Sequence, residues 1–344
     1  MINKSIINEY GFDEFFENQV QDNKNGLMIG RIIETHKDRY TVISNNGEMS
    51  AKLKGSFLYH VKSSDELPTI GDYVWLKSVE NGDAVLYSVF NRKSAFKRPD
   101  YMGHKENHAK SIQTQLVAAN FDYVFIMSSL NNDLNINRIS RYLAVTLQSK
   151  AVPVIILTKS DLCDDTEEKV SLLTAAFREV EIIAVSIFNN HGESQLKKYL
   201  TPGKTIAFLG SSGVGKSSLL NKLAETELMH VSHIRENDSK GRHTTTHRQL
   251  VMLDNGVMII DTPGMRELGL IDSDEGIGET FKDIIALEKT CKFNNCTHKN
   301  EPGCRIQEAL KNKELDERQY RNYLQFLEES KTTKLKSLKN KMKK

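Results

Sequence analysis

The chain is 344 residues long, which is enough for two or three domains of ordinary size. Apolar residues make up 39% and charged residues 27% of the chain, so the composition excludes a disordered or fibrous protein. The formal net charge is only +2, which excludes a uniformly basic molecule, although seven lysines and no acidic residue gather in residues 331–344.

No apolar run reaches the roughly 18–20 residues that span a bilayer. The first residues lack the apolar stretch and cleavage site of a secretory signal. We therefore expect a cytoplasmic protein with no membrane association. Four cysteines in such a chain argue against a disulfide framework and suggest metal ligands instead.

The first quarter of the chain has the pattern of a small β-barrel. After a polar leader at residues 1–25, five short β-like runs are separated by turn residues such as Gly71-Asp72. Strands at this spacing favour an OB-fold at residues 26–95, and another small barrel or a sandwich is the alternative. The five runs are residues 27–33, 40–43, 49–53, 73–79 and 84–90.

A basic segment follows at residues 93–110, where five lysines and arginines accompany His104 and His108. We expect an irregular linker that either faces nucleic acid or is simply solvated.

Residues 96–272 have the sequence pattern of an α/β domain. Nearly continuous apolar runs alternate with amphipathic stretches, a pattern that predicts buried parallel strands in βαβ units. Asp254-Asn255-Gly256 adds a hairpin signal between residues 249–253 and 257–260. The apolar runs are residues 123–127, 152–157, 182–185 and 205–209, and the amphipathic stretches are residues 137–149 and 167–180.

A glycine-rich segment directly follows the fourth apolar run. Residues 210–217 fit the phosphate-loop pattern G-x-x-x-x-G-K-[ST], and a helical stretch follows them. The glycines let backbone N–H groups turn toward phosphate oxygens, and the helix N-terminus adds a favourable dipole. We expect Lys216 to reach the β- and γ-phosphates and the Ser217 hydroxyl to bind Mg²⁺. The predicted phosphate-loop contacts are Gly210, Ser211, Ser212, Gly213, Val214, Gly215, Lys216, Ser217 and Ser218.

Two further segments complete the predicted phosphate site. Asp261-Thr262-Pro263-Gly264 follows an apolar run, which places Asp261 to hold Mg²⁺ through water and the Gly264 N–H to meet the γ-phosphate. One threonine of residues 244–246 should sense the γ-phosphate and Mg²⁺, and we favour Thr245. GTP can order such a segment, and hydrolysis can release it.

The preference for guanine rests on residues 158–161, Thr-Lys-Ser-Asp. The Asp161 carboxylate can accept hydrogen bonds from guanine N1–H and N2–H₂, whereas adenine would leave it unsatisfied, which conflicts with an ATP-using enzyme. Thr158 opens this motif, Lys159 should pack along the base, and the backbone of Ser186 should contact the base oxygen.

Cys291, Cys296, His298 and Cys304 lie within fourteen residues of one another. Three thiolates and one imidazole suit a single tetrahedral, structural Zn²⁺, and the full ligand set leaves no open position for catalysis. The surrounding region, residues 273–344, is expected to be mainly helical. Its lysines and arginines either face RNA or form a solvated surface. Cys163 stands apart and is expected to be an inert apolar residue.

The base motif precedes the phosphate loop here, the reverse of conventional small GTPases. The permuted order, GSSGVGKSS, GRHTTT, DTPG and the cysteine cluster closely resemble the bacterial RsgA (YjeQ) family over residues 26–321. The resemblance implies an OB domain, a circularly permuted α/β P-loop GTPase domain and a zinc domain. It also implies binding to the small ribosomal subunit and its rRNA late in assembly, with GTP hydrolysed to GDP under stimulation by that subunit.

The chain departs from the family pattern at two positions that contact the base. Thr158 stands in the place of Asn in Asn-Lys-x-Asp, and Ile187 replaces the usual Ala after Ser186. We expect weaker nucleotide affinity, with the choice of guanine preserved by Asp161.

Met265 occupies the position where Ras-like enzymes carry the Gln that orients water, so intrinsic hydrolysis should be slow. The resemblance supports His243 as the group that positions water, alongside Lys216 and Thr245. His247 is the second candidate, and a plain surface-loop role for His243 is the alternative. A different function is also open: a GTP-dependent RNA-binding switch with negligible turnover. With either function, the chain is expected to be a monomer.

Overall fold

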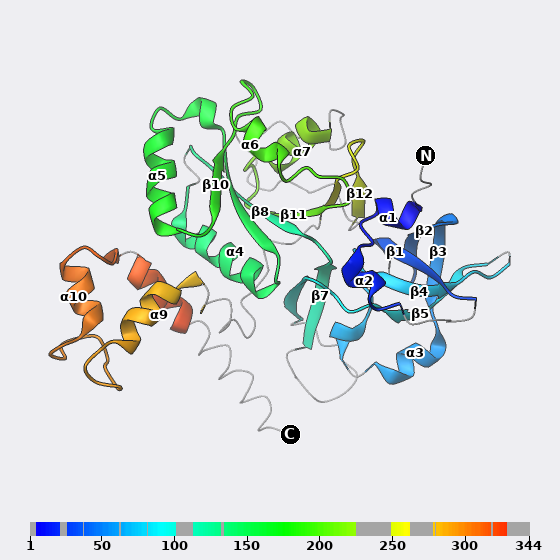
Figure 1. Ribbon diagram of the computed structural model, residues 1–344, viewed down its shortest axis with the longest axis horizontal. Helices are drawn as coiled ribbons and strands as arrows, with labels where there is room; N and C mark the ends of the chain where they lie inside the picture. Colours follow the sequence, from blue (N-terminus) through cyan, green and yellow to red (C-terminus); the bar gives the residue numbers. More distant parts are fainter. Residues whose placement is uncertain are drawn as a thin grey trace, which may run out of the picture.

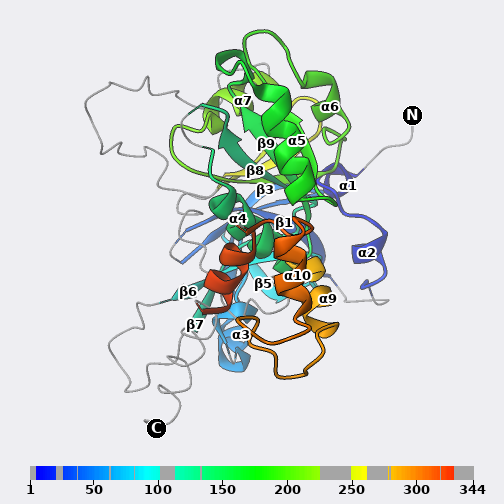
Figure 2. The same ribbon diagram turned by 90° about the vertical axis from the view of Figure 1, so that its left-hand side faces the viewer.

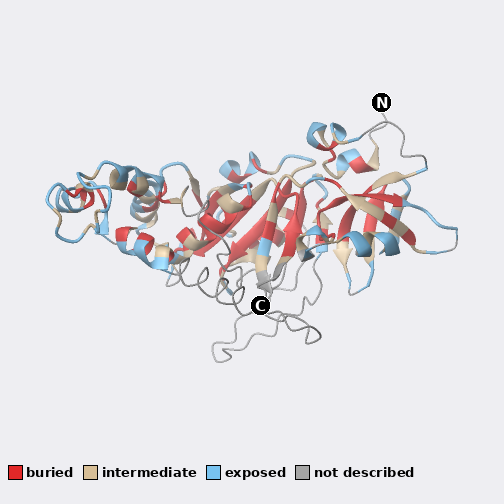
Figure 3. Cartoon of the chain, turned by 90° about the horizontal axis from the view of Figure 1, so that it is seen from below, coloured by how far each residue is buried: buried red, intermediate tan, exposed pale blue. Residues whose placement is uncertain are grey.

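The computed structural model places a barrel, an α/β sheet and a helical module side by side (Figure 1). It describes residues 5–328 except 21–25, 37, 62, 81, 101–112, 132–133, 225–248, 262–277, 279 and 318. Buried residues concentrate along the strands of the barrel and the sheet, and a smaller group lies in the helical module (Figure 3). Within the described residues, no helix has both the length and the apolar character needed to cross a bilayer.

The N-terminal strands form a closed five-stranded barrel, as the sequence predicts. Each strand is paired on both sides in the order β1-β2-β3-β5-β4, and β4 returns to pair with β1. The pairing of β3 with β5 is parallel and the others are antiparallel. The strands are β1 (Met28–Thr35), β2 (Tyr40–Ser44), β3 (Gly47–Leu53), β4 (Tyr73–Lys77) and β5 (Ala84–Val89), with helix α3 (Gly55–His60) and the turn η1 (Ser64–Glu66) between β3 and β4.

The described residues of the predicted polar leader, 5–20, pack against the barrel. They form the short helices α1 (Ile6–Glu9) and α2 (Glu14–Glu17). Phe16 is 1% exposed, and its ring centroid lies 4.2 Å from that of Tyr73 in β4. The prediction of a simple leader was therefore wrong. Each helix is only four residues long, too short to show a helical period in the sequence, and its burial depends on aromatic residues of the barrel.

We expect Phe16→Ala to lower the free energy of unfolding by about 3–5 kcal/mol, because it leaves a cavity between α2 and the barrel. Urea denaturation measures this change. Phe15→Ala is the matched control, since the neighbouring ring is 41% exposed and should lose much less. Equal effects of the two substitutions would contradict the packing of α2 described here.

The basic segment after the barrel is also more regular than predicted. β6 (Ala95–Asp100) pairs antiparallel with β7 (Gln113–Ala119) in a separate two-stranded sheet. Phe96 stacks on Phe121 with ring centroids 4.4 Å apart, and this contact anchors the hairpin to the core. The irregular-linker prediction is corrected for residues 95–100, whereas residues 101–112 lie outside the described part.

The central sheet confirms the predicted parallel α/β architecture. Its strand order is β10-β9-β8-β11-β13-β12, with β12 the only antiparallel neighbour among these six. The strands are β8 (Tyr123–Ser129), β9 (Val152–Thr158), β10 (Glu181–Ala184), β11 (Thr205–Gly210), β12 (Gln249–Met252) and β13 (Met258–Asp261). The helices are α4 (Ile136–Gln148), α5 (Thr166–Ala176), α6 (Glu193–Lys197) and α7 (Lys216–Ala224).

Barrel and sheet are joined through Arg31 of β1. Its side chain is 1% exposed and donates hydrogen bonds to the Tyr10, Gly71 and Asn120 carbonyl oxygens at 2.6, 3.3 and 2.9 Å. It also donates to Thr205 Oγ1 in β11 at 2.9 Å and lies 3.0 Å from Met258 Sδ in β13. One buried guanidinium therefore holds the N-terminal helices, the barrel and two central strands together.

The C-terminal module packs two helices, α9 (Lys282–Lys289) and α10 (Arg305–Lys311), side by side (Figure 2). Residues 319–328 form a further helix. Phe281, Ile306 and Phe326 are buried in a common core that also includes Ala144 of α4. This shared core docks the module on the α/β domain.

Candidate nucleotide and metal sites

The glycine-rich segment forms a loop between β11 and α7, as the phosphate-loop pattern predicts. Gly213 and Gly215 have φ values of 73° and 96°, a backbone conformation that side-chain-bearing residues rarely adopt. Lys216 begins α7, and its Nζ lies 3.2 Å from the Gly210 carbonyl oxygen. The lysine therefore folds back over the loop, where a bound phosphate would meet it.

The predicted base motif lies directly against this loop. Thr158 is buried at the end of β9, and its hydroxyl donates a 2.5 Å hydrogen bond to the Val214 carbonyl oxygen. Lys159 has a φ of 61°, and its Nζ donates to the Gly213 carbonyl oxygen at 3.0 Å. Although 56 residues separate Thr158 from Val214, the two segments share one site. The threonine at the Asn position thus holds the phosphate loop with its hydroxyl.

Asp161 lies in the short turn η2 (Ser160–Leu162) after β9, with its side chain exposed. The carboxylate is therefore free of the buried contacts that hold Thr158. Because β9 and β11 are both adjacent to β8 and parallel to it, their carboxyl ends lie at the same edge of the sheet. Ligands bind at this edge in open α/β sheets.

Ser186 shapes the next loop. Its N–H donates to the His191 carbonyl oxygen at 3.2 Å, and its hydroxyl accepts from the Phe188 N–H at 3.1 Å. The predicted backbone donor is thus already engaged within its own loop. His191 Nδ1 lies 2.9 Å from the Ser160 hydroxyl, which ties this loop to the base motif.

The sequence analysis missed Lys222 of α7. Its Nζ donates to the Ile187 carbonyl oxygen at 3.0 Å and to Asn190 Oδ1 at 2.5 Å. These hydrogen bonds therefore join the loop after β10 to α7, the helix that follows the phosphate loop. No motif or spacing in the sequence pointed to this contact, or to the one between His191 and Ser160.

His243, Thr245 and Gly264 lie outside the described residues, as do His247 and Met265. Asp261 is the last residue of β13, in register with Gln249 of β12, so its backbone lies at the carboxyl end of a strand that pairs with β11.

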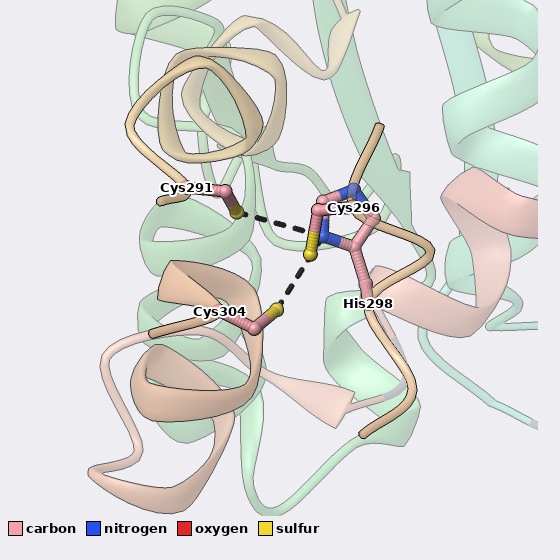
Figure 4. A group of neighbouring side chains, drawn as sticks. All are labelled: Cys291, Cys296, His298 and Cys304. Atoms are coloured by element: carbon pink, nitrogen blue, oxygen red, sulfur yellow. Dashed lines mark hydrogen bonds between the residues drawn. The ribbon is translucent and has the colours of Figure 1, made fainter. Parts of the chain in front are cut away.

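The four predicted metal ligands come together between α9 and α10 (Figure 4). Their ligand atoms all lie within 4.8 Å of one another. His298 Nδ1 is 3.6 Å from Cys291 Sγ and 3.4 Å from Cys304 Sγ. Zinc–sulfur and zinc–nitrogen bonds of about 2.3 and 2.0–2.1 Å place such atoms roughly 3.5 Å apart in a tetrahedral site. The cluster therefore fits a zinc ion in both donor chemistry and spacing.

Electrostatics at the cluster also favour a cation. Desolvation, together with the neighbouring Cys304 and Cys291 thiols, raises the pKa of the Cys296 thiol to about 11. Thiolates crowded in this way repel one another unless a positive ion lies between them.

The remaining cysteine packs against the core, as expected of an apolar residue, and also has polar neighbours. Cys163 is only partly buried, and its Sγ lies 3.0 Å from Asp165 Oδ1 and 3.3 Å from Lys169 Nζ. The polar neighbours are Asp165, which precedes α5, and Lys169 within that helix.

The chain is also similar to proteins of a known family. The model of the RsgA GTPase family matches residues 89–271. A relative from Listeria monocytogenes serotype 4b (strain F2365), small ribosomal subunit biogenesis GTPase RsgA 2, is 42% identical over 94% of this chain and 89% of its own.

Two solved structures share the fold. YjeQ from Thermotoga maritima is 28% identical, with a TM-score of 0.65 over 88% of this chain and 98% of its own. YloQ, described as a circularly permuted GTPase, has a TM-score of 0.62 at 23% identity over 91% of this chain and 98% of its own. The permuted order of the motifs thus corresponds to a known arrangement of the fold.

Proposed function

Because this chain belongs to the RsgA GTPase family and is therefore an enzyme that hydrolyses GTP, we propose that it acts in biogenesis of the small ribosomal subunit. The observation that carries the proposal is the similarity, over nearly the whole chain, to a relative named for that role. We propose a cytoplasmic monomer that binds the subunit, hydrolyses GTP under its stimulation and is then released.

The phosphate loop is the proposed cradle for the β- and γ-phosphates, with Lys216 neutralising their charge. Asp161 would select guanine, and Lys159 would pack along the base. Ser217, Thr245 and Asp261 would hold Mg²⁺, which supplies further charge neutralisation on the phosphates when bound. Gly264 would donate its N–H to the γ-phosphate. Water then attacks the γ-phosphorus in line with the departing oxygen of GDP.

The barrel, residues 26–95, and the zinc module, residues 273–344, are proposed to flank the GTPase domain, residues 96–272, and to contact rRNA. Lys289, Lys292 and Lys299 are exposed around the cluster and supply a basic surface. Arg305 contributes less charge, because it forms ion pairs with Glu308 and Glu314. Cys291, Cys296, His298 and Cys304 would hold one structural Zn²⁺ that fixes this surface.

We propose His243 as the group that positions the attacking water, since Met265 cannot do so. His243→Ala is expected to leave GTP binding intact and to lower subunit-stimulated turnover by at least about tenfold, within the usual contribution of a positioned acid or base. Phosphate release measured with small subunits tests this, and His247→Ala is the control. Unchanged turnover in His243→Ala would reject the role, and a loss confined to His247→Ala would transfer it to that residue.

The central experiment measures GTP hydrolysis with small ribosomal subunits, with large subunits and without ribosomes. Stimulation by small subunits alone supports the proposed function. Equal slow turnover in all three would leave the family assignment intact and favour the GTP-dependent RNA-binding switch. In that case, rRNA binding compared with GTP and with GDP is the next measurement.

A further inference from the structure

Glu288, in the last turn of α9, stands behind the proposed zinc ligand His298. Its Oε1 lies 3.4 Å from His298 Nε2, while Nδ1 of the same ring faces the Cys291 and Cys304 thiols. Both side chains are largely shielded from solvent, at 25% and 13% exposure. The imidazole therefore has one nitrogen on the thiol side and the other against a carboxylate.

The second oxygen of Glu288 is held by Tyr323. The Tyr323 hydroxyl donates to Glu288 Oε2 at 2.9 Å from the helix at residues 319–328. Desolvation, together with this hydrogen bond, raises the pKa of Tyr323, so its hydroxyl remains a donor across the physiological range. Tyr323 is buried in the core shared with α4.

From this geometry we propose that Glu288 and Tyr323 form the outer shell of the metal site and fix His298 as an Nδ1 ligand. A carboxylate at Nε2 keeps the proton on that nitrogen, which leaves the Nδ1 lone pair free for a metal ion. The carboxylate also makes the imidazole a stronger ligand. This inference rests on the zinc site proposed above and assigns a positioning role that the four ligands do not fill.

Residues other than Glu288 hold the backbone around His298. The backbone of the ligand loop therefore does not depend on the contact between Glu288 and the His298 ring. His298 has a φ of 59°, and its carbonyl oxygen accepts a 2.6 Å hydrogen bond from Gln307 Nε2. Glu301 accepts hydrogen bonds from the Thr297, Lys299 and Asn300 N–H groups at 2.9, 3.0 and 3.2 Å. Loss of Glu288 would therefore free the ring without unfolding the ligand loop.

The contacts that begin at the His298 ring continue through Tyr323 to the α/β domain. Tyr323 shares its core with Phe326, and Arg141 of α4 lies 5.8 Å from the Phe326 ring centroid. The link His298–Glu288–Tyr323 thus ties the cluster to the helix through which the module contacts the α/β domain. The simpler interpretation, an ordinary ion pair near the surface, predicts no effect of Glu288 on metal affinity.

The test uses the full-length protein loaded with zinc. Zinc content is measured first, and apparent affinity then follows from competition with a chromogenic zinc chelator. The variants are Glu288→Gln, which keeps the shape but removes the charge, and Tyr323→Phe, which removes only the hydroxyl. Glu308→Gln is the matched control, since Glu308 pairs with Arg305 and is 58% exposed.

We expect Glu288→Gln to weaken zinc binding by about 10–100-fold, Tyr323→Phe to weaken it less, and Glu308→Gln to leave it unchanged. The melting temperature of Glu288→Gln should fall below that of the parent protein with zinc bound and match it after the metal is removed. A deficit that persists without metal would show a merely structural role and overturn the inference, as would unchanged affinity in Glu288→Gln. If the parent protein holds no zinc, the zinc proposal itself fails.

Discussion

Asp161→Asn is expected to shift the nucleotide preference from guanine to xanthine by at least about 100-fold. The carboxylate can accept from both N1–H and N2–H₂ of guanine, whereas an amide offers one acceptor and places its NH₂ donor against the guanine amino group. Xanthine carries a carbonyl oxygen at that position and accepts from the amide instead. Mismatched polar groups in such a site cost several orders of magnitude in selectivity.

This substitution should leave the rest of the site intact. Asp161 is exposed, and the hydrogen bonds that hold the phosphate loop come from Thr158 and Lys159. Competition of GDP and XDP against a fluorescent guanine nucleotide measures the change. Asp164→Asn, at an exposed position three residues along the chain, is the control. Unaltered guanine preference in Asp161→Asn would remove Asp161 from the base site.

Arg31→Met is expected to lower the free energy of unfolding by at least about 3 kcal/mol. The change removes the guanidinium hydrogen bonds to the Tyr10, Gly71 and Asn120 carbonyl oxygens. The Tyr10 and Gly71 oxygens keep a second donor, the Tyr73 hydroxyl and the Asn120 amide, whereas the Asn120 oxygen loses its side-chain donor. Hydrogen bonds to a charged group contribute roughly 1.5–3 kcal/mol each, so the loss of several outweighs the donors that remain. Methionine fills similar space but offers no donor.

Urea denaturation checks this prediction, and Arg39→Met provides the control because Arg39 is 56% exposed beside Asp83. Arg31→Lys should fall between the parent and Arg31→Met, since one ammonium cannot reach all the acceptors of a guanidinium. Equal stability of Arg31→Met and Arg39→Met would show that barrel and sheet do not depend on this residue.

Local patterns determined most of what the sequence revealed. The five barrel strands, the parallel strands and the hairpin at Asp254-Asn255-Gly256 follow from short-range hydrophobic period and turn chemistry. The phosphate loop and the cysteine cluster were recognisable because their ligands lie close together in the chain. Because each motif is local, the order of the motifs along the chain could be read directly and revealed the permutation.

Tertiary structure decided what depends on distant residues. The burial of Phe16, the pairing of β6 with β7, and the contacts of Arg31, Lys222 and Glu288 all join segments without a shared local pattern. Thr158 illustrates the difference. The sequence showed only that a threonine stands in the place of Asn. The fold shows that the Thr158 hydroxyl donates a hydrogen bond to Val214 of the phosphate loop. Partners of a single polar group are set by the packing of whole elements, and spacing along the chain does not contain that information.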